Sequence, residues 1–412
     1  MEPKVHELKN GLRIVFHPTE KTDVAHCALM MHAGTRNEEK GQEGLAHFIE
    51  HMLFKGTTKR KSFHILNRLE VVGGELNAFT SKEETCVHAS FLSNYLERAV
   101  ELMDDIVFNC VFPEKELEKE KEVVCDEIRM YLDNPGEQIF DDFEGLLFKN
   151  MSLGHPILGN EKTVHSFKQP QLKKFTKTNY VPHNIVFAVA GNFEMKKIIA
   201  IAEKYFSKYK SSSAKLNKGD YKNYKVAHQQ IKKPTAQCHF VMGRAAHSLH
   251  HNDRMKMVLL NNILGGPGMN SRLNLGVREK YGYTYSIESG FNSYSDTGIF
   301  HVYLATEKKF VDKSISLAKK ELKKLATEKI GTVQLHQYKE QLKGQLALAR
   351  ENKSSVMISS AKSTLNFNKP FDMTTVYKRI DEISAGDLIN VAEDYFNADK
   401  FSSLMYDAEN KK

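Results

Sequence analysis

The chain has 412 residues, of which 41% are hydrophobic and 27% charged, so it can form two hydrophobic cores and is not a disordered chain. Its net charge of +8 comes from 59 Lys and Arg against 51 Asp and Glu mixed along the chain, which argues against nucleic-acid binding. The five cysteines form no Cys-x-x-Cys pair, and no apolar signal segment or membrane-spanning run is visible, so we expect a cytoplasmic protein without membrane association.

The first half of the chain predicts strands, then long helices, then a closing strand. Apolar runs bounded by turn residues predict strands over 5–17 (a pair around the turn at 9–11), 24–32, 76–79, 85–92 and 184–190. Apolar residues at helical spacing predict helices over 44–55, 62–72, 95–109, 114–132 and 195–205.

The second half repeats this order. Strands are expected over 239–242, 283–291, 298–305 and 401–406, and helices over 254–264, 312–327, 332–352 and 385–396. Between the halves the composition shifts to Lys, Ser, Asn and Tyr, which is typical of a linker. We therefore predict an α+β protein with two similar α/β sandwich domains: a first domain over 1–208, a linker over 209–230, and a structurally related second domain over 231–412.

A histidine pair in the predicted helix over 44–55 carries the clearest chemical signal. His47 and His51 are one helical turn apart, so they lie on one face and their ring nitrogens can reach one zinc ion. Glu50 follows His47 by three residues, so its carboxylate can face the same site and accept a proton from water polarised by the metal. The order His-x-x-Glu-His reverses the His-Glu-x-x-His order of zincins. The pattern predicts a zinc-dependent hydrolase.

A catalytic zinc site needs a third protein ligand and one open position. The predicted helix over 114–132 offers Glu120, Glu122, Asp126 and Glu127. Glu120 and Glu127 are seven residues apart and share one face of the helix, but the residues alone do not choose among the candidates. No fourth good ligand is evident, which favours an open catalytic position over the closed site of a zinc-stabilised binding protein.

Cysteine peptidase chemistry is a weaker interpretation of the same chain. Cys86 and His88 are two residues apart on a predicted strand, so their side chains point to the same face. No acidic residue is placed to orient the histidine, which a nucleophile–base pair requires.

The segments 33–38 (AGTRNE) and 44–57 (GLAHFIEHMLFKGT) closely resemble the active-site segment of the pitrilysin/insulinase family, the inverzincin zinc peptidases. Over essentially its whole length the chain resembles half-length members, such as bacterial processing proteases and the catalytic subunit of mitochondrial processing peptidase. The resemblance implies that Glu127 is the third zinc ligand. It also implies that Glu120 supports the site without being a main ligand.

The resemblance extends to a strand that would contact the substrate. The segment 76–80 (LNAFT) resembles the edge strand of the family. Asn77, Ala78 and Phe79 would then pair with the backbone of an extended peptide, which gives affinity with little demand on the peptide's sequence.

A further resemblance lies in the second half of the chain. The segment 277–286 (VREKYGYTYS) resembles the Arg/Tyr segment of the family, so Arg278 and Tyr285 would bind substrate carbonyls or the developing oxyanion. In half-length members two chains close around a chamber, each forming one half of a clamshell. Because this chain carries both the zinc motif and the Arg/Tyr pair, the resemblance implies a homodimer in which the pair faces the zinc of the other subunit.

Together these features predict a metalloendopeptidase that cleaves short or unfolded peptides in an enclosed chamber. Its expected cofactor is Zn²⁺, and its expected partners are peptides, with neither nucleic acid nor membrane among them. The alternative is a non-catalytic or partner-dependent scaffold subunit of a family heterodimer. Such members usually lose part of the His/Glu set, whereas this chain keeps all of it.

Overall fold

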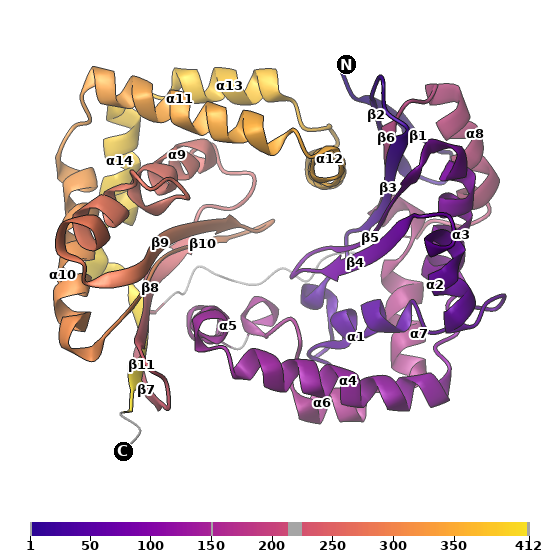
Figure 1. Cartoon of the computed structure of the whole chain (residues 1–412), viewed down its shortest axis with the longest axis horizontal. Coiled ribbons are helices and arrows are strands. Elements are labelled where there is room, and N and C mark those ends of the chain that lie inside the picture. Colours follow the sequence, from indigo (N-terminus) through magenta and orange to yellow (C-terminus); the bar gives the residue numbers. More distant parts are fainter. Residues whose placement is uncertain (1, 150, 213–224, 410–412) are drawn as a thin grey trace. The chain divides into compact units, whose positions relative to one another are not determined.

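The computed structural model describes residues 2–149, 151–212 and 225–409, which form two compact units (Figure 1). The first unit contains the chain up to Arg129, the segment that begins at His155, and Ala349–Phe371. The second contains Met130–Gly154, the segment that ends at Leu348, and the segment that begins at Asp372. Each unit has one mixed sheet with helices packed on it, so the expected α+β class with two similar domains is confirmed.

The sheet of the first unit has the strand order β1-β2-β6-β3-β5-β4. Strands β2 and β6 are parallel, and the other neighbouring pairs are antiparallel. Side chains alternate between the faces, so Ile14 and Phe16 enter one core while Val15 enters another. The strands are β1 (Lys4–Glu7), β2 (Arg13–Pro18), β3 (Val24–Met31), β4 (Glu75–Thr80), β5 (Thr85–Leu92) and β6 (Ile185–Gly191).

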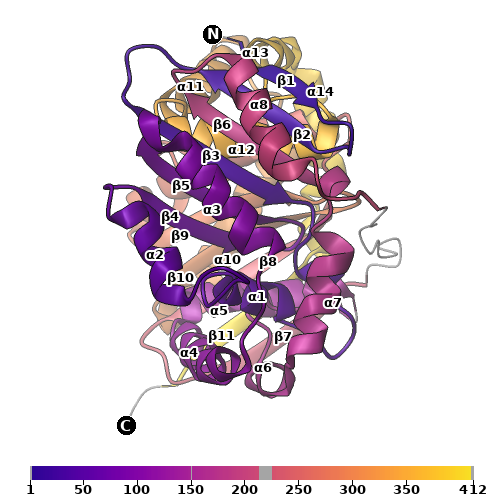
Figure 2. The ribbon, with the colours of Figure 1, turned by 90° about the vertical axis from the view of Figure 1, so that its right-hand side faces the viewer.

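Helices cover both faces of this sheet. On one face lie α8 (Met195–Phe206), α3 (Leu96–Phe108) and α2 (Ser62–Glu70), with α8 against β2, α3 against β3 and β5, and α2 against β4 (Figure 2). On the other face α12 (Lys353–Phe367) packs on β2, β6 and β3. Its contact residues Met357, Ala361 and Leu365 recur every four residues, which places them on one side of the helix.

The other helices of the first unit surround the β4 edge of the sheet. Helix α1 (Leu45–Met52) packs beside β4 and α7 (Gln169–Asn179). Helix α4 (Glu114–Leu132) runs past α1 and reaches α6 (Glu161–Ser166), where Cys125 Sγ lies 3.6 Å from His165 Nε2. The predicted zinc motif therefore lies on a helix beside the edge strand, where an extended chain has access to backbone hydrogen-bonding groups.

The second sheet repeats the design of the first. Its strand order is β7-β11-β8-β10-β9, with β7 and β11 parallel and the other pairs antiparallel. This order and these directions reproduce β2-β6-β3-β5-β4 strand for strand. The strands are β7 (His228–Lys233), β8 (Cys238–Ala246), β9 (Thr284–Ser293), β10 (Gly298–Thr306) and β11 (Ser402–Ala408).

Helices also cover both faces of the second sheet. One face carries the main core of this unit, whose helices are α9 (Arg254–Gly265), α10 (Val311–Thr327), α11 (Thr332–Ala349), α13 (Met373–Glu382) and α14 (Ala385–Tyr395). On the other face α5 (Pro135–Leu147) packs on β8 and β11 through Ile139, Phe143 and Leu147.

Each sheet has one face covered by a helix from the opposite half of the sequence. Helix α5 belongs to the first half but packs on the second sheet, and α12 belongs to the second half but packs on the first. The compact units are therefore not contiguous in sequence, and the domain boundaries at 208 and 231 stay predictions. The predicted linker over 209–230 falls largely on residues 213–224, which lie outside the described residues.

The exchanged helices were not predicted from the sequence, and neither were α6, α7, α13 and β7. Asn134, Pro135 and Gly136 form a turn-like sequence after α4, but Pro135 is the first residue of α5, a position where its fixed φ suits a helix. Helix α12 is rich in serine, so its apolar stripe is narrow. Among the described helices, none has the length and apolar character needed to cross a bilayer.

Candidate metal centre

A buried carboxylate and a glycine set the start of α1. Glu38 accepts hydrogen bonds from the backbone N–H groups of Gly44 (3.0 Å) and Ala46 (2.8 Å), so it satisfies donors that the first turn leaves unpaired. Gly44 has a φ of +92°, and a Cβ at this position would lie 2.5 Å from the carbonyl oxygen of Leu158. Only glycine fits this entry, which fixes where the helix begins and which face turns toward α4.

His47 and His51 converge on Glu127 of α4. The Nε2 atom of His47 lies 3.7 Å from Glu127 Oε2, and that of His51 lies 3.4 Å from the same oxygen. The ligand atoms of the three residues all lie within 4.8 Å of one another, so the group could hold a metal ion. Two imidazoles and one carboxylate form the three-ligand set of a catalytic zinc site, which leaves a coordination position for water or substrate.

The opposite side of the His51 ring is held by the buried carboxylate of Glu120, which also pairs with Lys55. Glu120 Oε1 lies 3.0 Å from His51 Nδ1, and Glu120 Oε2 lies 2.6 Å from Lys55 Nζ. A carboxylate on the second ring nitrogen orients the imidazole and directs Nε2 toward a metal. Glu120 therefore contacts His51 but is not one of the three residues that could bind the metal.

The other two acidic candidates of α4 point elsewhere. Asp126 accepts a hydrogen bond from Arg129 Nη1 at 2.8 Å, and its side chain is exposed. Glu122 is also exposed and lies 4.0 Å from His165 Nδ1. Of the four acidic side chains left open by the sequence, only Glu127 faces both Nε2 atoms.

Glu50 lies on the same helix and is held by the edge strand. The hydroxyl of Thr80, the last residue of β4, donates a 2.6 Å hydrogen bond to Glu50 Oε2. This bond connects the carboxylate to the strand that follows the free edge of the sheet. Thr80 therefore limits the rotation of Glu50 beside the His47–His51–Glu127 group.

Burial and hydrogen bonding separate the proton affinities in this group. Burial lowers the pKa of His47 to about 4, with a further contribution from the neighbouring His51. Burial raises the pKa of Glu50, against the opposing effect of the Thr80 hydrogen bond. Burial by itself would lower the pKa of His51. Hydrogen bonds and charges from Glu120 and Glu127 outweigh this effect and raise the pKa to about 9.

These directions have consequences for metal binding. The hydrogen bond from His51 lowers the pKa of Glu127, so this carboxylate is ionised at neutral pH. Without a metal, His51 carries a proton that a cation would have to displace, so metal affinity should fall in acid. The raised pKa of Glu50 strengthens it as a base and lets it return the proton once bound.

The predicted substrate strand lies at the open edge of the first sheet. Asn77, Ala78 and Phe79 are in β4, which pairs with β5 on one side and ends the strand order. Ala78 packs toward the core shared with α1, whereas Phe79 packs toward α12. The strand is therefore positioned to add a further strand along its other edge.

Arg278 and Tyr285 lie together in the second unit. Arg278 is the next-to-last residue of the π-helical segment η6 (Asn274–Glu279), and its guanidinium carbon lies 5.2 Å from the centroid of the Tyr285 ring near the start of β9. The Tyr285 side chain is 78% exposed, so its hydroxyl is accessible. The two side chains therefore lie close together, and their role in binding a substrate stays a prediction.

Three residues that shape the site were not singled out by their sequence pattern. Thr80 lies in the segment compared with the family's edge strand, but nothing in its spacing indicated the bond to Glu50. Lys55 lies four residues after His51, one turn along the same face, which is a usable signal. Glu38 lies six residues before Gly44, the residue at which α1 is capped, at a distance in sequence that no helix-capping pattern covers.

The alternative cysteine nucleophile is not supported by its surroundings. Cys86 lies in β5, its residue is fully buried, and burial raises the pKa of its thiol. A reactive cysteine needs a lowered pKa and access to substrate. Cys86 is instead part of the core against α12.

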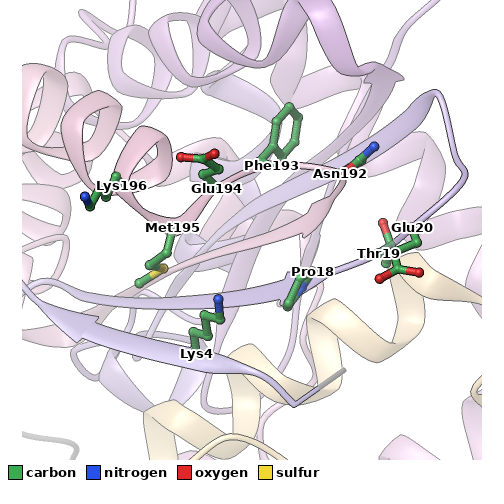
Figure 3. Close-up of a pocket in the computed structure, with 9 residues that line it drawn as sticks. All are labelled: Lys4, Pro18, Thr19, Glu20, Asn192, Phe193, Glu194, Met195 and Lys196. Carbon is green, nitrogen blue, oxygen red and sulfur yellow. The ribbon is translucent and has the colours of Figure 1, made fainter.

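A separate pocket of about 510 Å³ in the first unit lies between the β2 end and the start of α8 (Figure 3). Its charged lining residues are Lys4, Glu20, Glu194 and Lys196, and their side chains stand apart around the pocket. None of the residues around His47 lines it. The pocket lacks convergent acid–base or metal-ligating groups, so it is not the candidate site.

Comparison with known sequences shows matches along most of the chain. A family model described as insulinase (peptidase family M16) matches residues 13–161, and one described as peptidase M16 inactive domain matches residues 166–342. An uncharacterized zinc protease of Bacillus subtilis is 33% identical over 404 residues, covering 98% of each chain. One from Rickettsia felis is 32% identical over 406 residues, covering 97% of each chain.

Solved structures share the fold. A peptidase M16 inactive domain from Pseudomonas fluorescens has a TM-score of 0.91 at 20% identity, covering 99% of this chain and 98% of that chain. A protease from Helicobacter pylori has a TM-score of 0.89 at 22% identity, covering 98% of this chain and 99% of that chain. At these identities the structures support the fold alone.

Proposed function

Because the chain belongs to the insulinase family, peptidase family M16, we propose that it is a zinc-dependent endopeptidase that cleaves short or unfolded peptides. The observation that carries the proposal is the convergence of His47, His51 and Glu127 with Glu50 beside them. Homologues named as zinc proteases retain about 30% identity over nearly the whole chain, which supports the same chemistry here.

Zinc fits the donor set of this site. Two nitrogen donors and one carboxylate oxygen suit a borderline-soft ion, and the Lys55–Glu120–His51 chain orients one of the imidazoles. When bound, zinc would polarise both a water molecule and the scissile carbonyl. His47, His51 and Glu127 would hold it.

Glu50 is the proposed acid and base. Its carboxylate would accept a proton from the attacking water and then donate that proton to the leaving amine. The raised pKa of Glu50 makes its carboxylate a stronger base toward the attacking water. Thr80 holds Oε2 at 2.6 Å, which leaves Oε1 to exchange the proton.

The substrate would bind as an added strand along β4. Backbone groups of Asn77, Ala78 and Phe79 would pair with the extended peptide, so that affinity depends on the peptide backbone more than on its side chains. A folded protein cannot offer such a strand without unfolding locally. This limits the expected substrates to short or unfolded chains.

The proposal includes an enclosed chamber made by two copies of the chain. Arg278 and Tyr285, which form a pair in the second unit, would stabilise the oxyanion or bind substrate carbonyls at the zinc of the other subunit. The measurement is the particle mass in solution, for which we expect two chains. The proposed location remains the cytoplasm.

The test is cleavage of a mixed library of unstructured peptides by the wild type and by Glu50→Gln, with zinc content measured for both. We expect Glu50→Gln to retain zinc and to lose about 10²–10⁴-fold in rate, the usual contribution of a general base. Glu122→Gln, an exposed carboxylate on α4, is the matched control and should keep full activity.

The alternative function is a non-catalytic or partner-dependent scaffold subunit. It predicts that neither the wild type nor Glu50→Gln cuts any peptide while both hold zinc. Cleavage that appears only after adding a second family chain would show dependence on a partner. Cleavage by the wild type alone, abolished by a chelator and by Glu50→Gln, would exclude the scaffold role.

A further inference from the structure

A second cluster of metal-binding side chains lies in the loop between β8 and α9. His247 follows the last residue of β8, His251 lies in the loop, and Asp253 immediately precedes α9. One ligand atom from each residue lies within 4.8 Å of the others. All three residues belong to the second unit, so the cluster is distinct from the His47–His51–Glu127 group of the first unit.

His247 has the surroundings of a metal-binding imidazole. The residue is only 8% exposed, and its Nδ1 lies 3.0 Å from the hydroxyl of Tyr395 at the end of α14. Its Nε2 is buried and has no hydrogen-bond partner among the residues that the structure describes. A buried ring nitrogen without a partner is costly, whereas a cation at Nε2 would satisfy it. In the tautomer whose Nδ1–H donates to the Tyr395 hydroxyl, Nε2 keeps the lone pair that a metal requires.

His251 and Asp253 supply the other two donors. The His251 ring stacks on His247 with centroids 3.7 Å apart and planes 15° apart. Parallel rings cannot both direct a nitrogen at one ion, so His251 has to turn, and its 44% exposed side chain has room to do so. Asp253 Oδ2 lies 3.8 Å from His251 Nδ1, while Oδ1 is held by Lys256 at 2.8 Å.

The charges around the cluster are compatible with a divalent cation. The cluster includes one carboxylate, Asp253, whose Oδ1 is paired with Lys256 at 2.8 Å. Lys256 is itself paired with Asp387 at 2.8 Å, and Arg244 donates to the carbonyl oxygen of Asp394.

The backbone of the loop is already held in place. The N–H of Leu249 donates to Tyr294 O at 2.7 Å, and the N–H of Arg254 donates to His251 O at 3.1 Å. A Cβ on Gly298 would lie 2.2 Å from His247 O, so β10 approaches the loop closely. Helices α9 and α14 pack together beside the loop (Figure 1). Binding a metal would therefore leave the backbone in place but require the His251 ring to turn, which gives up the hydrogen bond that its Nδ1 accepts from the backbone N–H of Asp253 at 3.1 Å.

We propose that His247, His251 and Asp253 form a second metal site of this chain, which takes a first-row divalent ion such as Zn²⁺ and ties the β8–α9 loop to α14. Two imidazoles and one carboxylate disfavour Mg²⁺ and Ca²⁺, which prefer all-oxygen ligands. The site does not depend on the peptidase proposal, because none of its residues takes part in it.

The test measures zinc binding in a protein that lacks the first site. In a His47→Ala/His51→Ala background, equilibrium dialysis with zinc followed by elemental analysis should give one zinc per chain. Adding His251→Ala should weaken zinc binding by at least about tenfold, and adding Tyr395→Phe by about tenfold through loss of the Nδ1 partner. His336→Ala, an exposed histidine of α11 in the same unit, should leave it unchanged.

A second readout guards against effects on folding. Zinc should raise the melting temperature of the His47→Ala/His51→Ala protein and should not raise that of the same protein carrying His251→Ala, because an ion bound only to the folded state stabilises it. Absence of zinc binding in the background protein would overturn the proposal. Binding that His251→Ala does not weaken would also overturn it.

Discussion

The two units share a sheet design but differ in the side chains it carries. Strands β2-β6-β3-β5-β4 and β7-β11-β8-β10-β9 have the same order and the same directions. Helix α1 lies between β3 and β4 in the chain, and α9 lies between β8 and β9. Helix α1 presents two histidines and a glutamate, whereas α9 contains neither a histidine nor a carboxylate. The fold thus provides a scaffold, and a few side chains on one copy provide the chemistry.

The comparison extends to how each sheet is completed. Helix α12 covers the free face of the first sheet through Met357, Ala361 and Leu365, and α5 covers that of the second through Ile139, Phe143 and Leu147. Both helices come from the opposite half of the sequence. Neither half of the chain can therefore bury its own sheet on both faces, so we expect each half expressed alone to expose an apolar sheet face.

The largest effect should come from removing one imidazole of the metal group. His51→Ala removes a ligand, so we expect zinc to be lost and peptide cleavage to fall by at least about 10³-fold, or about 4 kcal/mol of transition-state stabilisation. His336→Ala makes the same change at an exposed histidine of α11 in the second unit, and should alter neither zinc content nor cleavage. Peptide cleavage and zinc content are measured for both variants. Retained cleavage in His51→Ala would break the proposed asymmetry between the units.

The exchanged helices should each stabilise the sheet they cover. Phe143→Ala should cost about 3–5 kcal/mol and Met357→Ala about 2–5 kcal/mol, since both side chains are buried and their loss leaves cavities. Hydrogen exchange should accelerate in β8 and β11 for Phe143→Ala, and in β3 and β6 for Met357→Ala. Leu348→Ala, at a 76% exposed position, is the control. Faster hydrogen exchange in the sheet of the other unit would contradict the packing of α5 on the second sheet and of α12 on the first.

The matching strands β2 and β7 should respond differently to acid. Burial, with the charge of Arg350, lowers the pKa of His17 in β2 to about 4. Between pH 6.5 and 4 the unfolded chain binds a proton that the folded chain does not, so stability is lost as pH falls through this window, by up to about 3 kcal/mol. His17→Gln should flatten this loss in urea unfolding measured from pH 7.5 to 4.

The control for this titration is His228→Gln, because His228 is the exposed histidine of β7. It should leave the pH dependence of the unfolding free energy unchanged. An equal change in both variants would show that the acid response does not come from the buried ring of His17.

The smallest expected effect concerns the hydrogen bond that holds Glu50. Thr80→Val removes the hydroxyl while keeping the shape of the side chain, so we expect kcat to fall about tenfold with KM and zinc content unchanged, as for a lost hydrogen bond to a charged group. Thr80→Ser keeps the hydroxyl and should restore most of the rate. A change in KM alone would mean that Thr80 acts through the peptide strand instead of Glu50.

Much of the fold followed from local patterns. The strands β3 and β5 and the helices α1 to α4 occur within a few residues of their predicted ranges, because each has an apolar periodicity that its own core requires. Helices α5 and α12 could not be predicted from local patterns. Their partners lie in the other half of the chain, so nothing near them in sequence indicates where their narrow apolar faces pack.

The sequence by itself determined the His47–Glu50–His51 face of α1, because residues one turn apart on a helix share a direction whatever surrounds them. Among Glu120, Glu122, Asp126 and Glu127, only the tertiary structure selected Glu127, since the choice depends on how α4 passes α1. The contacts of Thr80 with Glu50, and of His247 with Tyr395, were decided in the same way. Each joins segments that are distant in sequence, and their distances are set by the packing of the core between them.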